Sequence, residues 1–205
     1  MRIAFTGSHG TGKTTAAKIL RKVINEEMEE VTIAPLGSVT RSVLSWGSGG
    51  PTNSGPILSP EGNSFQLACI YERRRMMMAK GSMSADYVIS ERWAMDETAY
   101  QLHKAKKQMM DRDTGFTLRV CQMEMDWEYH NYWDRIYYIP ADQRPVDGDG
   151  TRPTDKEYQV DIDELIKTSL NMYKRSTKIK TIPTRLEDLE DYFRKEVESW
   201  KVKKK

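Results

Sequence analysis

The chain has 205 residues, and its 32 lysines and arginines nearly balance its 30 aspartates and glutamates, giving a formal net charge of +2. This length suits one α/β domain over residues 1–205, and the balanced charge gives no indication of nucleic-acid binding. The N-terminus lacks the apolar segment of a signal peptide, and no apolar run is long enough to cross a membrane. Cys69 and Cys121 lie in expected helices, so we predict free buried thiols and a cytoplasmic protein.

The most specific motif lies near the N-terminus, at Gly7-Ser8-His9-Gly10-Thr11-Gly12-Lys13-Thr14. It matches the phosphate-binding loop G-x-x-x-x-G-K-[ST], whose backbone N–H groups turn toward phosphate oxygens. In such a loop Lys13 binds the β- and γ-phosphates, and the Thr14 hydroxyl binds Mg²⁺. A β-favouring run precedes the loop and a helix-periodic run follows it, as the motif requires. We predict an ATP and Mg²⁺ site with nucleotide contacts at Gly7, His9 (an ordinary loop residue), Gly10, Thr11, Gly12, Lys13, Thr14 and Thr15.

Segments typical of strands and of helices alternate along the chain, which favours a parallel sheet covered by helices on both faces. The expected strands are 2–6, 31–34, 87–90, 135–139 and 178–182. The expected helices are one after Lys13, then 38–46, 61–80, 96–111, 116–133, 160–173 and a last one from Leu186 to Trp200. Pro35 is expected to close the second strand, and Thr114-Gly115 to separate the fourth and fifth helices. The predicted fold class is the three-layer α/β sandwich of phosphate-loop NTPases, with a five-stranded parallel sheet and a lid.

Polar segments interrupt this pattern in three places. Residues 47–60 are rich in glycine and proline and form a long loop, either closing over an acceptor or tolerated as an insertion. Residues 140–159 are expected to form a lid, in which Arg144 and Arg152 either bind ATP and the transferring phosphoryl group or are solvated. The basic tail, residues 201–205, is expected to be a frayed and solvated terminus.

Apolar side chains also gather in the fifth expected helix, where Phe116, Val120, Met123 and Trp127 share one face. The methionine-rich patches are expected to fill the core; they comprise Met76-Met77-Met78, Met109-Met110, Met123 and Met125.

Charged side chains follow the third expected strand, where Glu91 and Arg92 come directly after Ser90. Because ligands of open α/β sheets bind beyond the carboxyl ends of the strands, both residues are expected on the rim that carries the phosphate loop. A guanidinium suits phosphate, so Arg92 is expected to contact the transferring phosphoryl group or the acceptor. Arg73 either binds an acceptor phosphate or faces solvent, and Asp96 is expected to cap the following helix.

Three segments resemble known kinase families. Ile89-Ser90-Glu91-Arg92-Trp93-Ala94-Met95-Asp96-Glu97-Thr98-Ala99-Tyr100-Gln101 is similar to the Asp-Arg-Tyr…Ala-Tyr-Gln segment of thymidylate kinases and to the Glu-Arg-Ser segment of deoxynucleoside kinases. Phe65-Gln66 resembles the Phe-Gln of deoxynucleoside kinases, which implies that Gln66 reads a nucleobase. Residues 138–163 resemble the family typified by the ribosylnicotinamide-kinase domain, to which many phage-encoded kinases belong. The resemblance implies a P-loop kinase of the nucleoside/nucleotide kinase superfamily.

Two departures from these families bear on the acceptor. The segment Ala34-Pro35-Leu36-Gly37 lacks the Glu-Pro-Gly of thymidylate kinases, which argues against thymidine monophosphate. Gln159 stands where the third family more often has arginine, so the identity of the lid cation stays open.

The chemistry of the acceptor gives a further criterion, because a hydroxyl benefits from a carboxylate base while an ionised monophosphate does not need one. Glu91 is placed to act as that base, and the resemblance to deoxynucleoside kinases implies the same role. The competing role for Glu91 is to organise Mg²⁺. We expect ATP-dependent phosphoryl transfer to a nucleoside, nucleotide or related hydroxyl. The catalytic candidates are Lys13, Glu91, Arg92 and Arg152; those for the acceptor are Gln66, Arg73 and Glu91; those for Mg²⁺ are Thr14 and Glu91. An acceptor within DNA or at a polynucleotide end, a non-kinase ATPase, and a monomer or a homodimer stay open.

Overall fold

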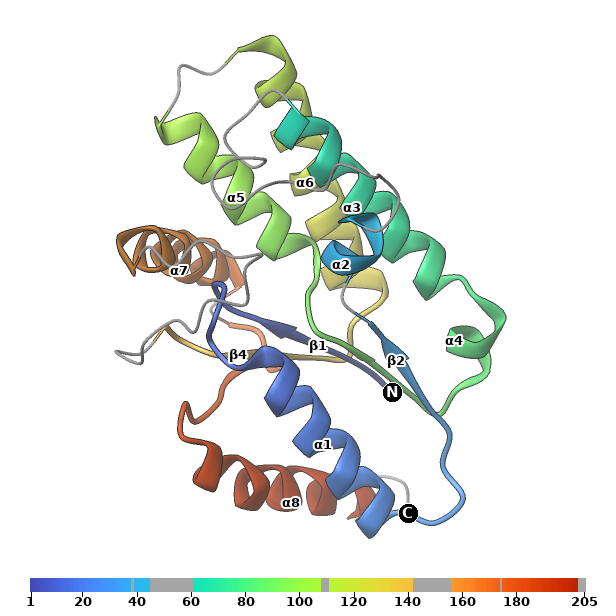
Figure 1. Ribbon diagram of the computed structural model, residues 1–205. Coiled ribbons are helices and arrows are strands. Elements are labelled where there is room, and N and C mark those ends of the chain that lie inside the picture. The colour runs from blue at the N-terminus through green and yellow to red at the C-terminus, as the bar shows by residue number, and fades with distance from the viewer. Residues whose placement is uncertain (38, 45–60, 108–110, 142–155, 174, 203–205) are drawn as a thin grey trace.

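Strands and helices alternate along the chain in the computed structural model, which describes residues 1–37, 39–44, 61–107, 111–141, 156–173 and 175–202 (Figure 1). In chain order the elements are β1 (Arg2–Thr6), α1 (Lys13–Glu27), β2 (Ile33–Leu36), α2 (Val39–Leu44), α3 (Glu61–Met77), α4 (Lys80–Ser84), β3 (Tyr87–Ser90), α5 (Ala94–Lys107), α6 (Arg112–Asn131), β4 (Arg135–Tyr138), α7 (Lys156–Leu170), the 3₁₀ turn η1 (Asn171–Tyr173), β5 (Ile179–Thr181) and α8 (Leu186–Val202).

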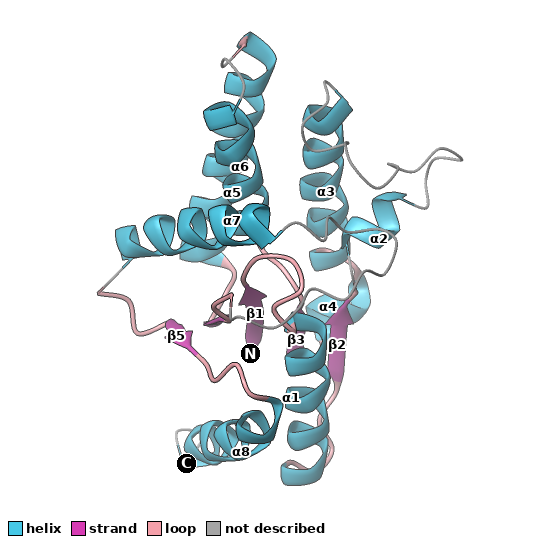
Figure 2. Cartoon of the chain, turned by 60° about the vertical axis from the view of Figure 1, so that its left-hand side comes forward, coloured by secondary structure: helices cyan, strands magenta, loops and turns pink. Residues whose placement is uncertain are grey.

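The five strands form one parallel sheet in the order β2-β3-β1-β4-β5, as the alternation predicts. Its central strands are buried on both sides, since helices cover both faces (Figure 2). Helices α1 and α8 lie on one face, and α5, α6 and α7 lie on the other (Figure 1). The predicted three-layer sandwich is therefore confirmed.

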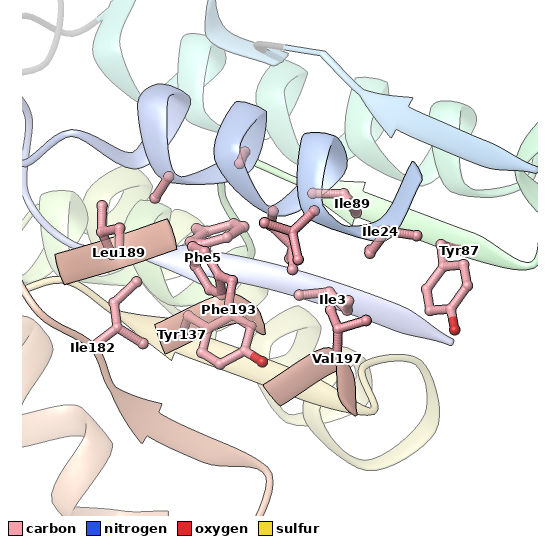
Figure 3. Packing of buried hydrophobic residues seen from close by; sticks show 14 of the residues in the cluster. Ile3, Phe5, Ile24, Tyr87, Ile89, Tyr137, Ile182, Leu189, Phe193 and Val197 are labelled. Atoms are coloured by element: carbon pink, nitrogen blue, oxygen red, sulfur yellow. The ribbon is translucent and has the colours of Figure 1, made fainter. Parts of the chain in front are cut away.

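The core under α1 and α8 is almost entirely apolar. Phe5 of β1 meets Phe193 of α8 edge to face at 6.1 Å between ring centroids, and Tyr137 of β4 packs against both rings. Figure 3 shows these rings between the sheet and the two helices, with Ile24 of α1 and Val197 of α8 extending the cluster. Burial of this apolar surface holds β1, and the loop that follows it, in place.

Several expected element boundaries are wrong. Strand β2 contains Pro35 instead of ending there, because β2 is an edge strand, where a residue without an N–H is tolerated. The third helix stops at Met77, and the extended backbone of Ala79 separates it from α4, which contains Gly81. No break occurs at Thr114-Gly115, which lie inside α6: the helix is capped earlier, where the Asp111 carboxylate accepts a 2.6 Å hydrogen bond from the Thr114 N–H.

Other expectations on loops and side chains have mixed outcomes. Residues 156–159 of the expected lid belong to α7, and Lys201 of the expected tail belongs to α8. Met77 and Met125 are buried as expected, whereas Met78 and Met123 are exposed. Residues 47–60, Met109 and Met110, and the lid arginines lie outside the described residues.

The two cysteines are free and buried as predicted, and burial raises the pKa of both thiols to about 12.

Candidate active site

The phosphate loop leaves the carboxyl end of β1 through backbone that only glycine accepts readily. Gly7 has φ 151°, and a Cβ on it would lie 2.5 Å from the carbonyl oxygen of Ile139. Gly12, at φ 86°, is the residue before α1, so the unpaired N–H groups of this helix begin directly after the loop. A helix N-terminus of this kind attracts phosphate through its N–H groups and its dipole.

Lys13 lies within the loop, largely buried. Its ammonium donates hydrogen bonds to the carbonyl of Gly7, at 2.7 Å, and to the carbonyl of Ser8. The Thr11 hydroxyl also donates to the Ser8 carbonyl, at 3.0 Å. The loop thus holds a cation among its own carbonyls, at the point where the motif requires a phosphate-binding lysine.

The rim beyond β3 meets the phosphate loop at one contact. Thr14, in the first turn of α1, donates a hydrogen bond from its hydroxyl to the carboxylate of Glu91, with 2.7 Å between Oγ1 and Oε2. Glu91 is the first residue after β3, which pairs in parallel with β1, so both loops lie at the same edge of the sheet. The predicted meeting of Glu91 with the loop is confirmed.

The oxygens of Thr14 and Glu91 fit Mg²⁺, which is commonly bound by one or two protein oxygens together with waters and substrate phosphates. Within the described ranges, no group of three or more histidine, cysteine or acidic side chains is placed to hold a metal ion. If Mg²⁺ binds at this site, Thr14 and Glu91 would hold it, and the ion would supply positive charge to the transferring phosphate oxygens.

Arg92 does not point freely into solvent. Its guanidinium donates to Asp96 at 3.0 Å and lies over the ring of Tyr100 at 5.6 Å from the centroid. Asp96 also accepts hydrogen bonds from the Thr6 hydroxyl, at 3.1 Å, and from the Trp93 N–H that precedes α5, at 3.3 Å. Asp96 thereby helps to cap α5, as predicted, and also ties Arg92 to β1. Burial raises the pKa of Asp96, although Arg92 and Lys13 oppose this shift.

A second arginine, Arg73 of α3, is completely buried, which excludes the solvent-facing alternative. It donates to Glu97 of α5 at 2.9 Å and to Glu128 of α6 at 2.7 Å. Burial alone would lower the pKa of the guanidinium, but the two carboxylates outweigh it and raise the pKa well above its ordinary value. The sequence indicated Arg73 as a candidate but could not indicate its partners, because Glu97 and Glu128 come from two other helices. We call Arg73, Glu97 and Glu128 the buried charge cluster.

Several polar groups beside this cluster have no hydrogen-bond partner among the described residues. They include Nη2 of Arg73, Oε2 of Glu97, Nε1 of Trp93 and both amide atoms of Gln101. Gln101 is fully buried and lies one helical turn after Glu97, and Gln66 lies two turns before Arg73 on the same side of α3. Unpaired buried polar groups are costly, so their concentration here indicates a ligand-binding region.

Helix α7 contacts the phosphate loop from the other side through residues 158 and 159 of the expected lid, which the sequence did not predict to be helical. Gln159 donates to the backbone carbonyl of His9 at 2.7 Å, and Tyr158 packs its ring against that of His9, with 5.3 Å between centroids. Tyr158 also contacts Tyr100 and His103 of α5. The one available signal was Gln159, which stands where the resembled family carries arginine.

The structure thus brings Gly7, His9, Gly10, Thr11, Gly12, Lys13, Thr14, Glu91 and Arg92 together, with exposed Thr15 in the first turn of α1. Gln66 and Arg73 lie beside them in the helical layer of α3, α5 and α6. Arg144 and Arg152 lie outside the described residues. In the part of the chain that the structure describes, no helix is long and apolar enough to cross a membrane.

Comparisons with known proteins agree with this geometry. A sequence profile of the family described as AAA domain matches residues 2–188. A deoxyadenosine kinase from M. mycoides, solved with dCMP and a flexible dCDP, has a similar fold with TM-score 0.66 at 10% identity, over 97% of this chain and 99% of that one. A thymidylate kinase from Ehrlichia chaffeensis gives TM-score 0.59 at 18% identity, over 97% of both chains. A NadR protein in complex with NAD and AMP-PNP gives 0.60 at 15% identity, over 89% of this chain and 44% of that one. No curated protein matches the sequence.

Proposed function

The chain belongs to this AAA domain family, and we propose that it is a cytoplasmic, Mg²⁺-dependent kinase that transfers the γ-phosphate of ATP to a hydroxyl group of an uncharged nucleoside-type acceptor. The observation that carries the proposal is the 2.7 Å contact between Thr14 and Glu91. It joins a phosphate loop to a carboxylate at the neighbouring strand end, where an acceptor would meet the γ-phosphate. The kinase folds named above support the reaction class.

The charges of the site favour an acceptor without a phosphate of its own. A monophosphate acceptor carries about two negative charges and would need cations to bind it. Arg92 is engaged by Asp96, and Arg73 by Glu97 and Glu128. Among the described residues of this rim and of the buried charge cluster, four carboxylates (Glu91, Asp96, Glu97 and Glu128) outnumber the three cations of Lys13, Arg73 and Arg92. A neutral hydroxyl compound avoids the repulsion that a phosphate would meet there.

The polar groups beside the buried charge cluster favour a planar heterocycle. Gln66, Gln101 and the Trp93 N–H bring hydrogen-bond donors and acceptors together in a largely dry region between α3 and α5. A nucleobase carries donors and acceptors along one edge, and binding it would satisfy groups that otherwise lack partners. We therefore assign base recognition to Gln66 and Gln101, with Arg73 holding the surrounding carboxylates in place.

Glu91 takes the proton of the acceptor hydroxyl in this proposal. The contact with Thr14 also favours a second role, in which Glu91 positions a water molecule of Mg²⁺. The two roles differ in what a Glu91→Gln variant loses: loss of a base lowers the rate at saturating Mg²⁺, whereas loss of a metal organiser raises the Mg²⁺ concentration needed.

The test is transfer of label from [γ-³²P]ATP to nucleosides, the matching 5′-monophosphates, ribosylnicotinamide, and DNA with natural or hydroxymethylated bases. We expect transfer to a nucleoside-type hydroxyl and none with Lys13→Ala, which removes the phosphate-binding cation. Transfer only to monophosphates would contradict the uncharged acceptor, and transfer only to DNA would move the acceptor into a polynucleotide.

A second candidate is ATP hydrolysis without an acceptor, which the family description favours. Phosphate released at the same rate with and without every acceptor, and lost in Lys13→Ala, would establish the ATPase in place of the kinase.

A further inference from the structure

A line of buried polar side chains runs between α3 and α5. Its members are spaced three, four or seven residues apart on their helix, so those of one helix lie on one side of it. They are Asn63, Gln66 and Arg73 of α3, and Glu97, Gln101 and Lys104 of α5. We call these six side chains the polar seam.

The polar seam has an inner and an outer end, because the two helices run in opposite directions (Figure 1). Arg73, near the end of α3, pairs with Glu97 near the start of α5 at 2.9 Å. Asn63, near the start of α3, contacts Lys104 near the end of α5 at 3.0 Å. Helix α5 begins just after the loop that carries Glu91, so Glu97 marks the end close to the phosphate loop. The seven residues from Glu97 to Lys104 place the outer end about 10 Å further along the helix.

The middle of the polar seam can bind a hydrogen-bond donor or an acceptor. A side-chain amide carries both an N–H donor and a carbonyl acceptor, and its orientation follows its partners. Gln66 and Gln101 are such amides, and in the part of the chain that the structure describes both amide atoms of Gln101 lack a partner. These two glutamines therefore do not by themselves distinguish a base with an amino group from one with an oxo group.

The outer end of the polar seam is different, because it presents a donor. Lys104 is only 2% exposed, and an ammonium has donors and no acceptor. Its Nζ donates to Oδ1 of Asn63, which engages the acceptor of that amide. Nδ2 of Asn63 donates in turn to Oγ1 of Thr114 at 3.4 Å, so both ends of the amide are held in one orientation. A base that reaches this end meets the ammonium donor beside an amide oxygen that is already engaged.

We propose that Lys104 determines acceptor specificity, and that the acceptor is a nucleoside whose base carries an oxo group, and not an amino group, on the edge far from the sugar. The proposal rests on the proposed function, because it places the acceptor hydroxyl at Glu91 and the base along the polar seam. An oxo group accepts a hydrogen bond from the ammonium. An amino group would set donor against donor and leave buried groups without partners.

The experiment compares two pairs of nucleosides that differ in this group: uridine with cytidine, and inosine with adenosine, each also as the 2′-deoxynucleoside. Titration calorimetry with a non-hydrolysable ATP analogue measures binding, and kcat/KM with ATP measures transfer. In the pair that fits the site, we expect wild type to favour the oxo base by at least about tenfold in both measurements.

The test variant is Lys104→Met, which keeps an unbranched side chain and removes the donor. It should reduce the preference for the oxo base to less than about twofold. The matched control is Lys106→Met, since Lys106 is an exposed lysine on the same helix. The control should keep the full preference, and thermal melting should show that both variants are folded.

The possible results separate this proposal from the proposed function. Binding that favours the oxo base without transfer would contradict the kinase and support the role of Lys104. Transfer to both members of a pair with equal kcat/KM, or a preference for the amino base, would support the kinase and overturn the role of Lys104. Equal preferences in Lys104→Met and Lys106→Met would also overturn it, and wild type that binds none of these nucleosides would overturn both proposals. If Lys104→Met does not fold, the preference of wild type decides.

Discussion

The two faces of the sheet are built on different principles. Under α1 and α8 the interior is apolar, and the ion pairs lie outside, where Arg194 of α8 contacts Glu26, Glu27 and Glu190. Under α3, α5 and α6 the interior is also largely apolar, but it encloses the fully buried ion pairs of Arg73, and large apolar side chains lie on the outside. Buried ion pairs seldom stabilise a fold as well as apolar packing does. In the proposed function, the second face serves binding and the first serves stability.

The sharpest test of this contrast is Arg73→Met. It leaves Glu97 and Glu128 buried without their cation, and we expect unfolding free energy to fall by about 3–5 kcal/mol. Combining it with Glu97→Gln and Glu128→Gln removes the unpaired charges and should recover most of that loss, while acceptor binding stays lost. Urea unfolding and the KM for the acceptor measure the two effects. A triple variant as unstable as Arg73→Met would show that the ion pairs of Arg73 with Glu97 and Glu128 themselves stabilise the fold.

Phe193→Ala tests the apolar face. It removes a fully buried ring that contacts Phe5 and Tyr137, so we expect a loss of about 3–5 kcal/mol. Below its lowered melting temperature the variant should keep the wild-type KM for the acceptor. An altered acceptor KM in the folded variant would show that the two faces are not functionally separate.

Removing the contact between α7 and the phosphate loop should lower the stability by an intermediate amount. Gln159→Ala leaves the His9 carbonyl without this donor, which should cost about 1–3 kcal/mol. Part of the loss should appear as weaker ATP binding, measured by titration calorimetry, because the loop backbone is less well held. Gln159→Glu, similar in shape but without the amide donor, should behave like the alanine variant; normal ATP binding by both would rule out this role.

The surface ion pairs of α1 and α8 should give the smallest effect, and one that depends on pH. Hydrogen bonds from Lys201 and Arg194 lower the pKa of Glu27, and those from Arg194 and Lys22 lower the pKa of Glu190. A lowered pKa stabilises the folded state above the unfolded value of about 4.5, and this contribution disappears as pH falls through the folded value. The small stability difference between wild type and Glu27→Gln/Glu190→Gln at pH 7 should therefore shrink as the pH falls below about 4.5 and vanish once both carboxylates are protonated in the folded state. A difference that persists in acid would contradict this origin.

The sequence predicted this architecture well where local patterns decide it. The phosphate loop, the parallel strands and the position of Glu91 follow from spacing and strand ends, and all three are confirmed. Boundaries that depend on neighbours were wrong: Pro35 remains in β2 only because that strand is at the edge, and α6 continues through Gly115 because Asp111 caps it earlier. The partners of Arg73 and the contact of Gln159 with His9 join residues that are 24 to 150 positions apart. No local pattern encodes such pairs.

The central claim is that Glu91 joins the phosphate loop to an acceptor hydroxyl, and the rate of phosphoryl transfer by Glu91→Gln tests it most directly. The measurement is single-turnover label transfer from [γ-³²P]ATP to the best acceptor at saturating Mg²⁺. We predict a rate about 10²–10⁴-fold below wild type, with ATP binding retained. A variant that regains the wild-type rate when Mg²⁺ is raised would contradict the base and leave Glu91 as the residue that organises the metal.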